Sequence, residues 1–189
     1  MISLERYPKD ITLRDGTRLS LRPMAAEDAG ALWSFLQALP AIDKAHIRED
    51  IDRREAVERW ARSLDYGTVL PVLAWAEDRV VGNVTLFRNR SGWKQRVGIV
   101  RILIAPDFRH RGLGTALIRE IRHLGEKGAL VYLVAEVIEE QQDAIRALER
   151  MGFERAVVYR NYANDRAGRL HNLVVLLHPM TGSGEEVFY

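Results

Sequence analysis

One run of the sequence combines residue types and spacing that suit a phosphate-binding site. Its two glycines let the main chain turn tightly and approach a ligand closely. A helix starting at this point presents unpaired N–H groups, which together with the helix dipole attract an anion. Two arginines flank these groups, so the run predicts a pyrophosphate site. Its members are Arg109, His110, Arg111, Gly112, Leu113, Gly114 and Thr115.

Two common phosphate-binding motifs do not match this loop. The dinucleotide pattern G-x-G-x-x-G/A requires a small residue three positions after its second glycine, where this chain has Leu117. The P-loop requires Gly-Lys-Ser/Thr, which is absent from this run. The pattern R-x-x-G-x-G remains, and the buried strand and Pro106-Asp107 before it, with the helix after it, strengthen the prediction.

The amino-acid composition excludes several other kinds of functional site. The chain has no cysteine, which excludes disulfide scaffolds, zinc fingers, iron–sulfur sites and a thiol nucleophile. We expect no metal. The 28 basic residues, mostly arginine, are interspersed with 26 acidic ones, so we expect no nucleic-acid partner. The sequence shows neither a signal peptide nor an apolar run of membrane-spanning length, which predicts a cytoplasmic protein with no membrane partner.

Hydrophobic periodicity predicts the elements that must position the loop. A length of 189 residues with 47% hydrophobic composition favours one domain over residues 1–189. We expect an α+β fold with a mixed sheet of about seven strands and about four helices. The expected helices lie near residues 29–36, 57–64, 113–124 and 144–151. The expected strands lie near residues 11–13, 19–21, 70–76, 80–87, 97–105, 130–137, 156–162 and 170–177.

Two segments of the chain resemble the GCN5-related N-acetyltransferase (GNAT) family. RILIAPDFRHRGLGTALI is similar to that family's central strand, pyrophosphate loop and helix, and EVIEEQQDAIRALERMGF is similar to its later strand and closing Gly-Phe helix. The resemblance covers about residues 10–178. It implies a layered αβα acyl-CoA acyltransferase fold with acetyl-CoA as cosubstrate. It also implies direct transfer of an acetyl group to a primary amine of a small molecule or a protein, and allows a homodimer.

The resemblance also implies roles for individual residues. The main chain of Ile102, Leu103 and Ile104 would lie beside the pantetheine arm of the coenzyme. Residues 109–115 would surround its pyrophosphate. Gln141 takes the place of an asparagine common in the family and keeps an amide donor and acceptor.

Catalytic groups are harder to place. Many relatives carry a tyrosine acid where this chain has Leu148, and positions 97–104 contain no carboxylate. The candidates for proton transfer are therefore Glu136, near the end of a buried strand, and Tyr159 on the penultimate strand. Tyr162 on the same strand and His171 on the last strand could also supply a proton.

Arg101 is the one charge in the apolar strand at residues 97–105. If buried it needs a partner, either an acidic residue of the fold or a carboxylate of the substrate.

The missing tyrosine leaves two hypotheses open. The first is an N-acetyltransferase that holds acetyl-CoA and an amine together, because positioning the reactants contributes strongly to the rate even without an acid. The second is a non-catalytic sensor that binds coenzyme A or acyl-coenzyme A. Turnover with any amine would decide for the enzyme.

Overall fold

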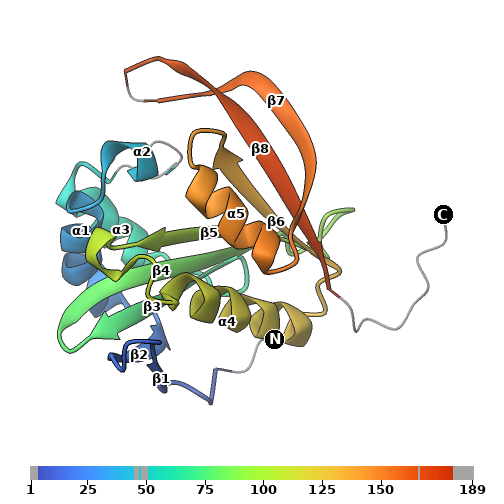
Figure 1. Ribbon diagram of the computed structural model, residues 1–189. Helices are drawn as coiled ribbons and strands as arrows, with labels where there is room; N and C mark the ends of the chain where they lie inside the picture. The colour runs from blue at the N-terminus through green and yellow to red at the C-terminus, as the bar shows by residue number, and fades with distance from the viewer. Residues whose placement is uncertain (1–3, 45–46, 48–50, 166, 181–189) are drawn as a thin grey trace.

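The fold is built on one mixed sheet, shown in Figure 1. The computed structural model describes residues 4–44, 47, 51–165 and 167–180. The strand order is β1-β2-β3-β4-β5-β6-β8-β7, and of these described strands only β5 and β6 pair in parallel. The strands are β1 (Lys9–Thr12), β2 (Arg18–Pro23), β3 (Val69–Ala76), β4 (Arg79–Arg88), β5 (Val97–Ile104), β6 (Tyr132–Ile138), β7 (Glu154–Asn164) and β8 (Leu170–Pro179).

The sheet has eight strands where the sequence predicted about seven. The difference lies in counting, because each strand segment expected from the sequence is present. Even the short β1 pairs with β2, in a register that sets Ile11 opposite Leu19. The predicted α+β class and the mixed sheet are confirmed.

Helices cover the two faces of this sheet. The α-helices of the described residues are α1 (Ala29–Gln37), α2 (Ala41–Lys44), α3 (Arg54–Arg62), α4 (Leu113–Lys127) and α5 (Gln142–Arg150). Both α1 and α4 pack against β4, but on opposite faces. The layers are therefore α, β, α. The helix added to the predicted four is α2, whose four residues are too few to show helical periodicity.

The core explains why β4 lies at the centre of the fold. Residues Val80 to Leu86 are all buried, because helices cover both faces of this strand. On the α4 face, Gly82 lies so close to the helix that an added Cβ would be 3.1 Å from Leu113 and 3.2 Å from Leu117. This close packing fixes α4, and hence its N-terminus, against the sheet.

A buried carboxylate ties the N-terminal segment to α4. Glu120 accepts hydrogen bonds from Tyr7 (2.5 Å), Lys9 (2.7 Å) and Arg6 (3.2 Å). Burial alone would raise the pKa of Glu120, but the bonds from Lys9 and Tyr7 outweigh it and lower the pKa. Because the carboxylate stays charged and paired, it is a structural contact rather than a candidate reactive group.

The two parallel strands separate before they end. β5 and β6 are paired from Val97 opposite Tyr132 to Val100 opposite Ala135. Beyond this point β5 continues to Ile104 on its β4 side, and β6 continues to Ile138 on its β8 side. The opening between the two strand ends is called the fork from here on.

Candidate functional site

The fork is open to an additional extended chain. Backbone groups of successive residues in a strand point to opposite edges. The carbonyl oxygen of Ile104 accepts from Arg109, which reaches across from the fork side. Ile102, two residues earlier, therefore also presents its N–H and C=O to the fork. Both residues agree with the prediction of main-chain contacts to a pantetheine arm.

Leu103 differs from that prediction. It is paired with Asn83 of β4, so its backbone groups point away from the fork. Its side chain is 3% exposed and lies on the sheet face beneath α1 and α3. The alternation of the strand gives Leu103 a packing position in place of a backbone contact with the coenzyme.

The glycine-rich loop brings the N-terminus of α4 to the end of β5. Gly112 is the N-cap residue with φ at +94°, a left-handed conformation that favours glycine, and no side chain caps the helix. His110 is exposed and also has a positive φ. The backbone N–H groups at the start of α4, from Leu113 to Thr115, are thus presented as an anion-binding terminus.

The loop positions have different surroundings. The Leu113 side chain is 1% exposed in the core, so only its backbone can contact a ligand. Gly114 lies against β5, because an added Cβ would be 3.2 Å from Ile104 Cδ1. Thr115 is half-buried in the first turn of α4.

Arg109 and Gln141 are joined by a residue that the sequence did not single out. Asp43 of α2 accepts hydrogen bonds from Arg109 and, at 3.0 Å, from Gln141 Nε2. Arg109 also donates to the Ile104 carbonyl oxygen at 3.3 Å. The structure therefore brings these two predicted coenzyme contacts together across the mouth of the fork. No sequence signal marked Asp43, which lies in a charge-rich segment without periodicity.

Arg111 points away from the fork. Its guanidinium binds Asp15 and Thr17 (2.7 Å) in the turn between β1 and β2, and lies 4.7 Å from the centre of the Phe108 ring. Hydrogen bonds from Thr17 and from Arg111 hold the pKa of Asp15 at about 2. In this structure Arg111 fixes the loop to the first hairpin, which supports the loop from behind.

Glu136 lies at the fork itself. It is the first β6 residue after the last pair with β5, and its half-buried side chain shares a sheet face with Val134. Arg101 holds the corresponding position on β5, on the same face. Within the part of the chain that the structure describes, Glu136 makes no hydrogen bond or ion pair. A carboxylate in this position can accept a proton beside the fork.

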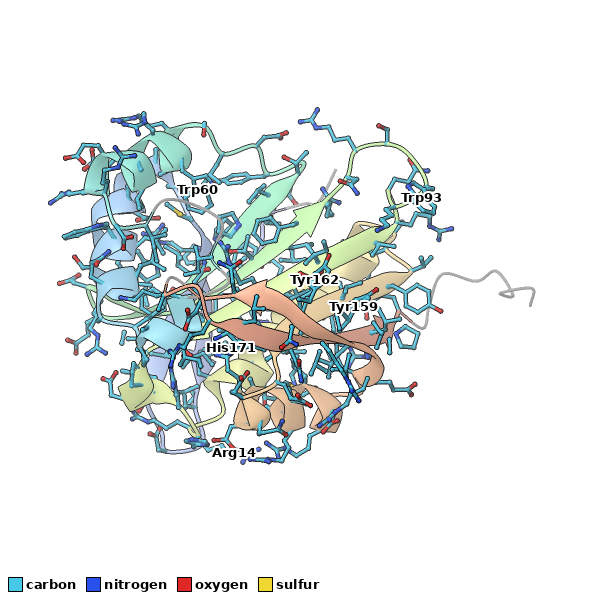
Figure 2. The ribbon with its side chains drawn as sticks, turned by 90° about the horizontal axis from the view of Figure 1, so that it is seen from above. Arg14, Trp60, Trp93, Tyr159, Tyr162 and His171 are labelled. Atoms are coloured by element: carbon cyan, nitrogen blue, oxygen red, sulfur yellow. The ribbon has the colours of Figure 1, made fainter. Side chains whose placement is uncertain are left out.

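Tyr159 is not brought to the fork. It lies on β7, which β8 and β6 separate from β5, and its side chain is 46% exposed. Figure 2 shows it beside Tyr162 on the same strand, and their ring centres are 4.9 Å apart. The two tyrosines pack on each other at the sheet edge, so this position does not support the predicted proton transfer by Tyr159.

His171 is held between two carboxylates at the start of β8. Its Nδ1 lies 2.8 Å from Glu140 Oε1 and its Nε2 lies 3.4 Å from Asp165 Oδ2. The hydrogen bond with Glu140, followed by the close approach of Asp165, raises the pKa of His171 above its usual value. Together these contacts join the loop after β6 to the β7–β8 hairpin.

We expect the thermal stability contributed by His171 to depend on pH. Because its pKa is raised in the folded protein, this contribution is complete below pH about 6.5 and declines as the pH rises through the folded pKa. The melting-temperature difference between the wild type and His171→Gln should therefore be larger at pH 5.5 than at pH 9. Calorimetric scans at both pH values measure it, and an equal difference at both would contradict the prediction.

The described residues contain neither a candidate metal site nor a candidate membrane-spanning helix. No group of three or more histidine, cysteine, aspartate or glutamate residues there could hold a metal ion. None of the helices in the described ranges is both long and apolar enough to cross a membrane.

The forked mixed sheet, with a helix that begins at a glycine beside the fork, defines a class of layered αβα proteins with an uncapped helix N-terminus at an open strand pair. The chain belongs to the acetyltransferase (GNAT) family, whose model matches residues 33–153. This confirms the family resemblance seen in the sequence.

Named relatives are similar over part of the chain. This chain is 32% identical over 79 residues to the ribosomal protein bS18-alanine N-acetyltransferase of Escherichia coli. The match covers 42% of this chain and 53% of the relative. The chain thus spans about half the length of the curated relatives it matches.

Solved structures share the fold over most of the chain. The ribosomal-protein-S5-alanine acetyltransferase of Vibrio fischeri has a TM-score of 0.77 at 11% identity, covering 88% of this chain and 96% of that one. An acetyltransferase structure from Salmonella typhimurium, containing its cofactor acetyl-CoA, has a TM-score of 0.74 at 15% identity with the same coverage of each chain.

Proposed function

We propose that the protein is an acetyl-CoA-dependent N-acetyltransferase that transfers the acetyl group directly to a primary amine. The observation that carries this proposal is the fork between β5 and β6, opening beside the uncapped N-terminus of α4. The fork offers backbone groups to an extended arm, and the helix offers N–H groups to a pyrophosphate. Family membership supports the same assignment.

The residues present fit such a cosubstrate. Ile102 and Ile104 present backbone groups along the fork, while Gly114 and Thr115 present N–H groups at the helix N-terminus. The loop lies close against the strand, because an added Cβ at Gly114 would be 3.2 Å from Ile104 Cδ1. Acetyl-CoA supplies an activated thioester, and the backbone N–H groups of β5 can stabilise negative charge on its carbonyl oxygen.

A side chain of the protein can remove the proton from the ammonium group of the acceptor. Glu136 accepts a proton from the ammonium group of the acceptor, directly or through water, and leaves a neutral amine. The amine nitrogen would then form a bond to the acetyl carbon as the carbon–sulfur bond breaks. The nitrogen would lose its second proton to solvent, giving the amide, and the thiolate would take a proton from solvent. Because the chain has no cysteine, an acetyl-cysteine intermediate is excluded and transfer is direct.

A thiol-release assay with a broad panel of primary amines tests this function. We expect acetyl-CoA to bind with micromolar affinity by calorimetry and at least one amine to release free thiol at a rate above hydrolysis. Acetyl-CoA binding without turnover on any amine would instead support the sensor hypothesis. Absence of acetyl-CoA binding would contradict both.

A further inference from the structure

Helix α2 lies at the end of β5 that borders the fork (Figure 1). None of the four described residues of this helix is buried, so packing contributes little to holding it in place. The side chain of its Asp43 is nevertheless only 13% exposed, because the carboxylate is bonded to groups on both sides of the fork. The contacts of Asp43 therefore hold α2 across the mouth of the fork.

These contacts engage three groups that are assigned to the coenzyme. Asp43 accepts hydrogen bonds from Arg109 and, at 3.0 Å, from Gln141 Nε2. Arg109 in turn donates from Nε and Nη2 to the carbonyl oxygen of Ile104, both at 3.3 Å. The guanidinium, the amide and the strand carbonyl are thus bonded to one another at the position where the coenzyme would need them.

A carboxylate and a pyrophosphate are alternative partners for the same guanidinium. Both present anionic oxygens that match the planar N–H groups of arginine. Asp43 neutralises the charge of Arg109 and would repel a pyrophosphate placed beside it. Because the Asp43 side chain is largely shielded from water, salt screens this repulsion less than it would at an exposed site.

We infer that Asp43 sets the affinity for the coenzyme by competing with its pyrophosphate for Arg109. This inference rests on the proposed binding of acetyl-CoA at the fork and adds to it a residue that weakens this binding. Removal of the Asp43 charge should therefore tighten coenzyme binding. Replacing a residue with a purely structural role would instead weaken binding or leave it unchanged.

Calorimetry with coenzyme A tests the inference without any acceptor amine. Asp43→Asn removes the charge with little change in size, so its dissociation constant should be about 3- to 10-fold lower than that of the wild type. Asp43→Glu keeps the charge and should bind coenzyme A no more tightly than the wild type. 3′-Dephospho-coenzyme A retains the pyrophosphate, so Asp43→Asn should bind it more tightly by a similar factor.

A double-mutant cycle shows whether Asp43 acts through Arg109. Arg109→Gln removes the guanidinium and should itself weaken coenzyme A binding. In the Arg109→Gln background, Asp43→Asn should lose most of its effect, because the two anions no longer compete for this group.

Asp65→Asn is the matched control, because Asp65 also pairs with an arginine, Arg90, but precedes the start of β3. Val69, which begins β3, is opposite Phe87, and Phe87 is opposite Ile99 near the start of β5. The control thus lies at the other end of β5 from the fork. It removes the same charge and should leave the affinity for coenzyme A unchanged. Melting temperatures of all variants show whether each is folded.

Three results would overturn the inference. The first is unchanged or weaker coenzyme A binding in folded Asp43→Asn, and the second is an equal gain in the Arg109→Gln background. The third is a gain with coenzyme A but none with 3′-dephospho-coenzyme A, which would place the 3′-phosphate beside Arg109. Each of them leaves the proposed function standing, because the wild type still binds coenzyme A. If neither the wild type nor Asp43→Asn binds coenzyme A, the proposed function fails as well, whereas binding by Asp43→Asn alone would support the competition.

Discussion

Gly112→Asp and Gly114→Asp are each expected to weaken acetyl-CoA binding by at least about 100-fold, because charge-assisted hydrogen bonds contribute roughly 1.5–3 kcal/mol each. Gly112 caps α4 with φ at +94°, and Gly114 follows in the first turn. A carboxylate at either position lies against the N–H groups that would bind the pyrophosphate. It therefore competes with the coenzyme for the same donors and repels its charge.

These variants are expected to fold. Aspartate tolerates the left-handed conformation better than most residues, and a negative charge near a helix N-terminus is stabilising. At Gly112 the three atoms nearest to an added Cβ all belong to the Arg14 side chain, the closest at 3.4 Å. At Gly114 the Ile104 side chain, 3.2 Å away, must shift slightly. Loss of binding can thus be separated from loss of structure by measuring the melting temperature.

Gly92→Asp is the matched control for this experiment. Gly92 also has a positive φ, at +84°, and nothing lies within 4 Å of an added Cβ. Calorimetry should give wild-type acetyl-CoA affinity for this variant. A truncated substrate, S-acetyl-pantetheine, lacks the pyrophosphate and should react equally with all three variants and the wild type. Wild-type acetyl-CoA affinity in Gly112→Asp and Gly114→Asp would refute the placement of the pyrophosphate.

Local sequence signals predicted the elements of this site well. The alternation of apolar residues located the strands, and the glycine-rich loop located the start of α4. Both signals arise from neighbours in the chain, since strand period and helix capping depend on residues a few positions apart. The residue types around Gly112 were therefore sufficient to predict an anion site before any tertiary contact was known.

Ion pairs between side chains far apart in the sequence could not be predicted from the sequence. The partner of Arg109 is Asp43, 66 positions earlier, and the partner of Arg111 is Asp15, 96 positions earlier. With 26 acidic residues in the chain, no local rule selects these two. The same limit applies to Tyr159, because only the order β6-β8-β7 shows how far its strand lies from the fork.

The fork itself also depends on tertiary structure. The buried patterns of β5 and β6 predict two central strands, but not where their pairing stops. That point decides which residues matter, because Glu136 and Arg101 are the first positions past the last pair. From the sequence alone, Glu136 is a carboxylate near the end of a strand. In the structure it lies at the fork, where the proposed reaction would take place.

Glu136→Gln is expected to lower kcat for an alkylamine acceptor by about 10²- to 10⁴-fold, the usual contribution of a general base. The substitution keeps the size of the side chain and removes its ability to take a proton from an ammonium group. Acetyl-CoA affinity should not change, since Glu136 is on β6 and the anion site is formed by the start of α4. Steady-state kinetics and calorimetry on the same preparation measure the two quantities.

The choice of acceptor separates a base from a structural carboxylate. An aromatic amine is already neutral at pH 7 and needs no base before it attacks, so the effect of Glu136→Gln should be much smaller with this acceptor than with an alkylamine. Glu154→Gln, on the exposed edge strand β7, is the control and should affect neither reaction. An equal loss with both amines would show that Glu136 holds the fork in shape. A selective loss with the alkylamine identifies Glu136 as the group that removes the proton.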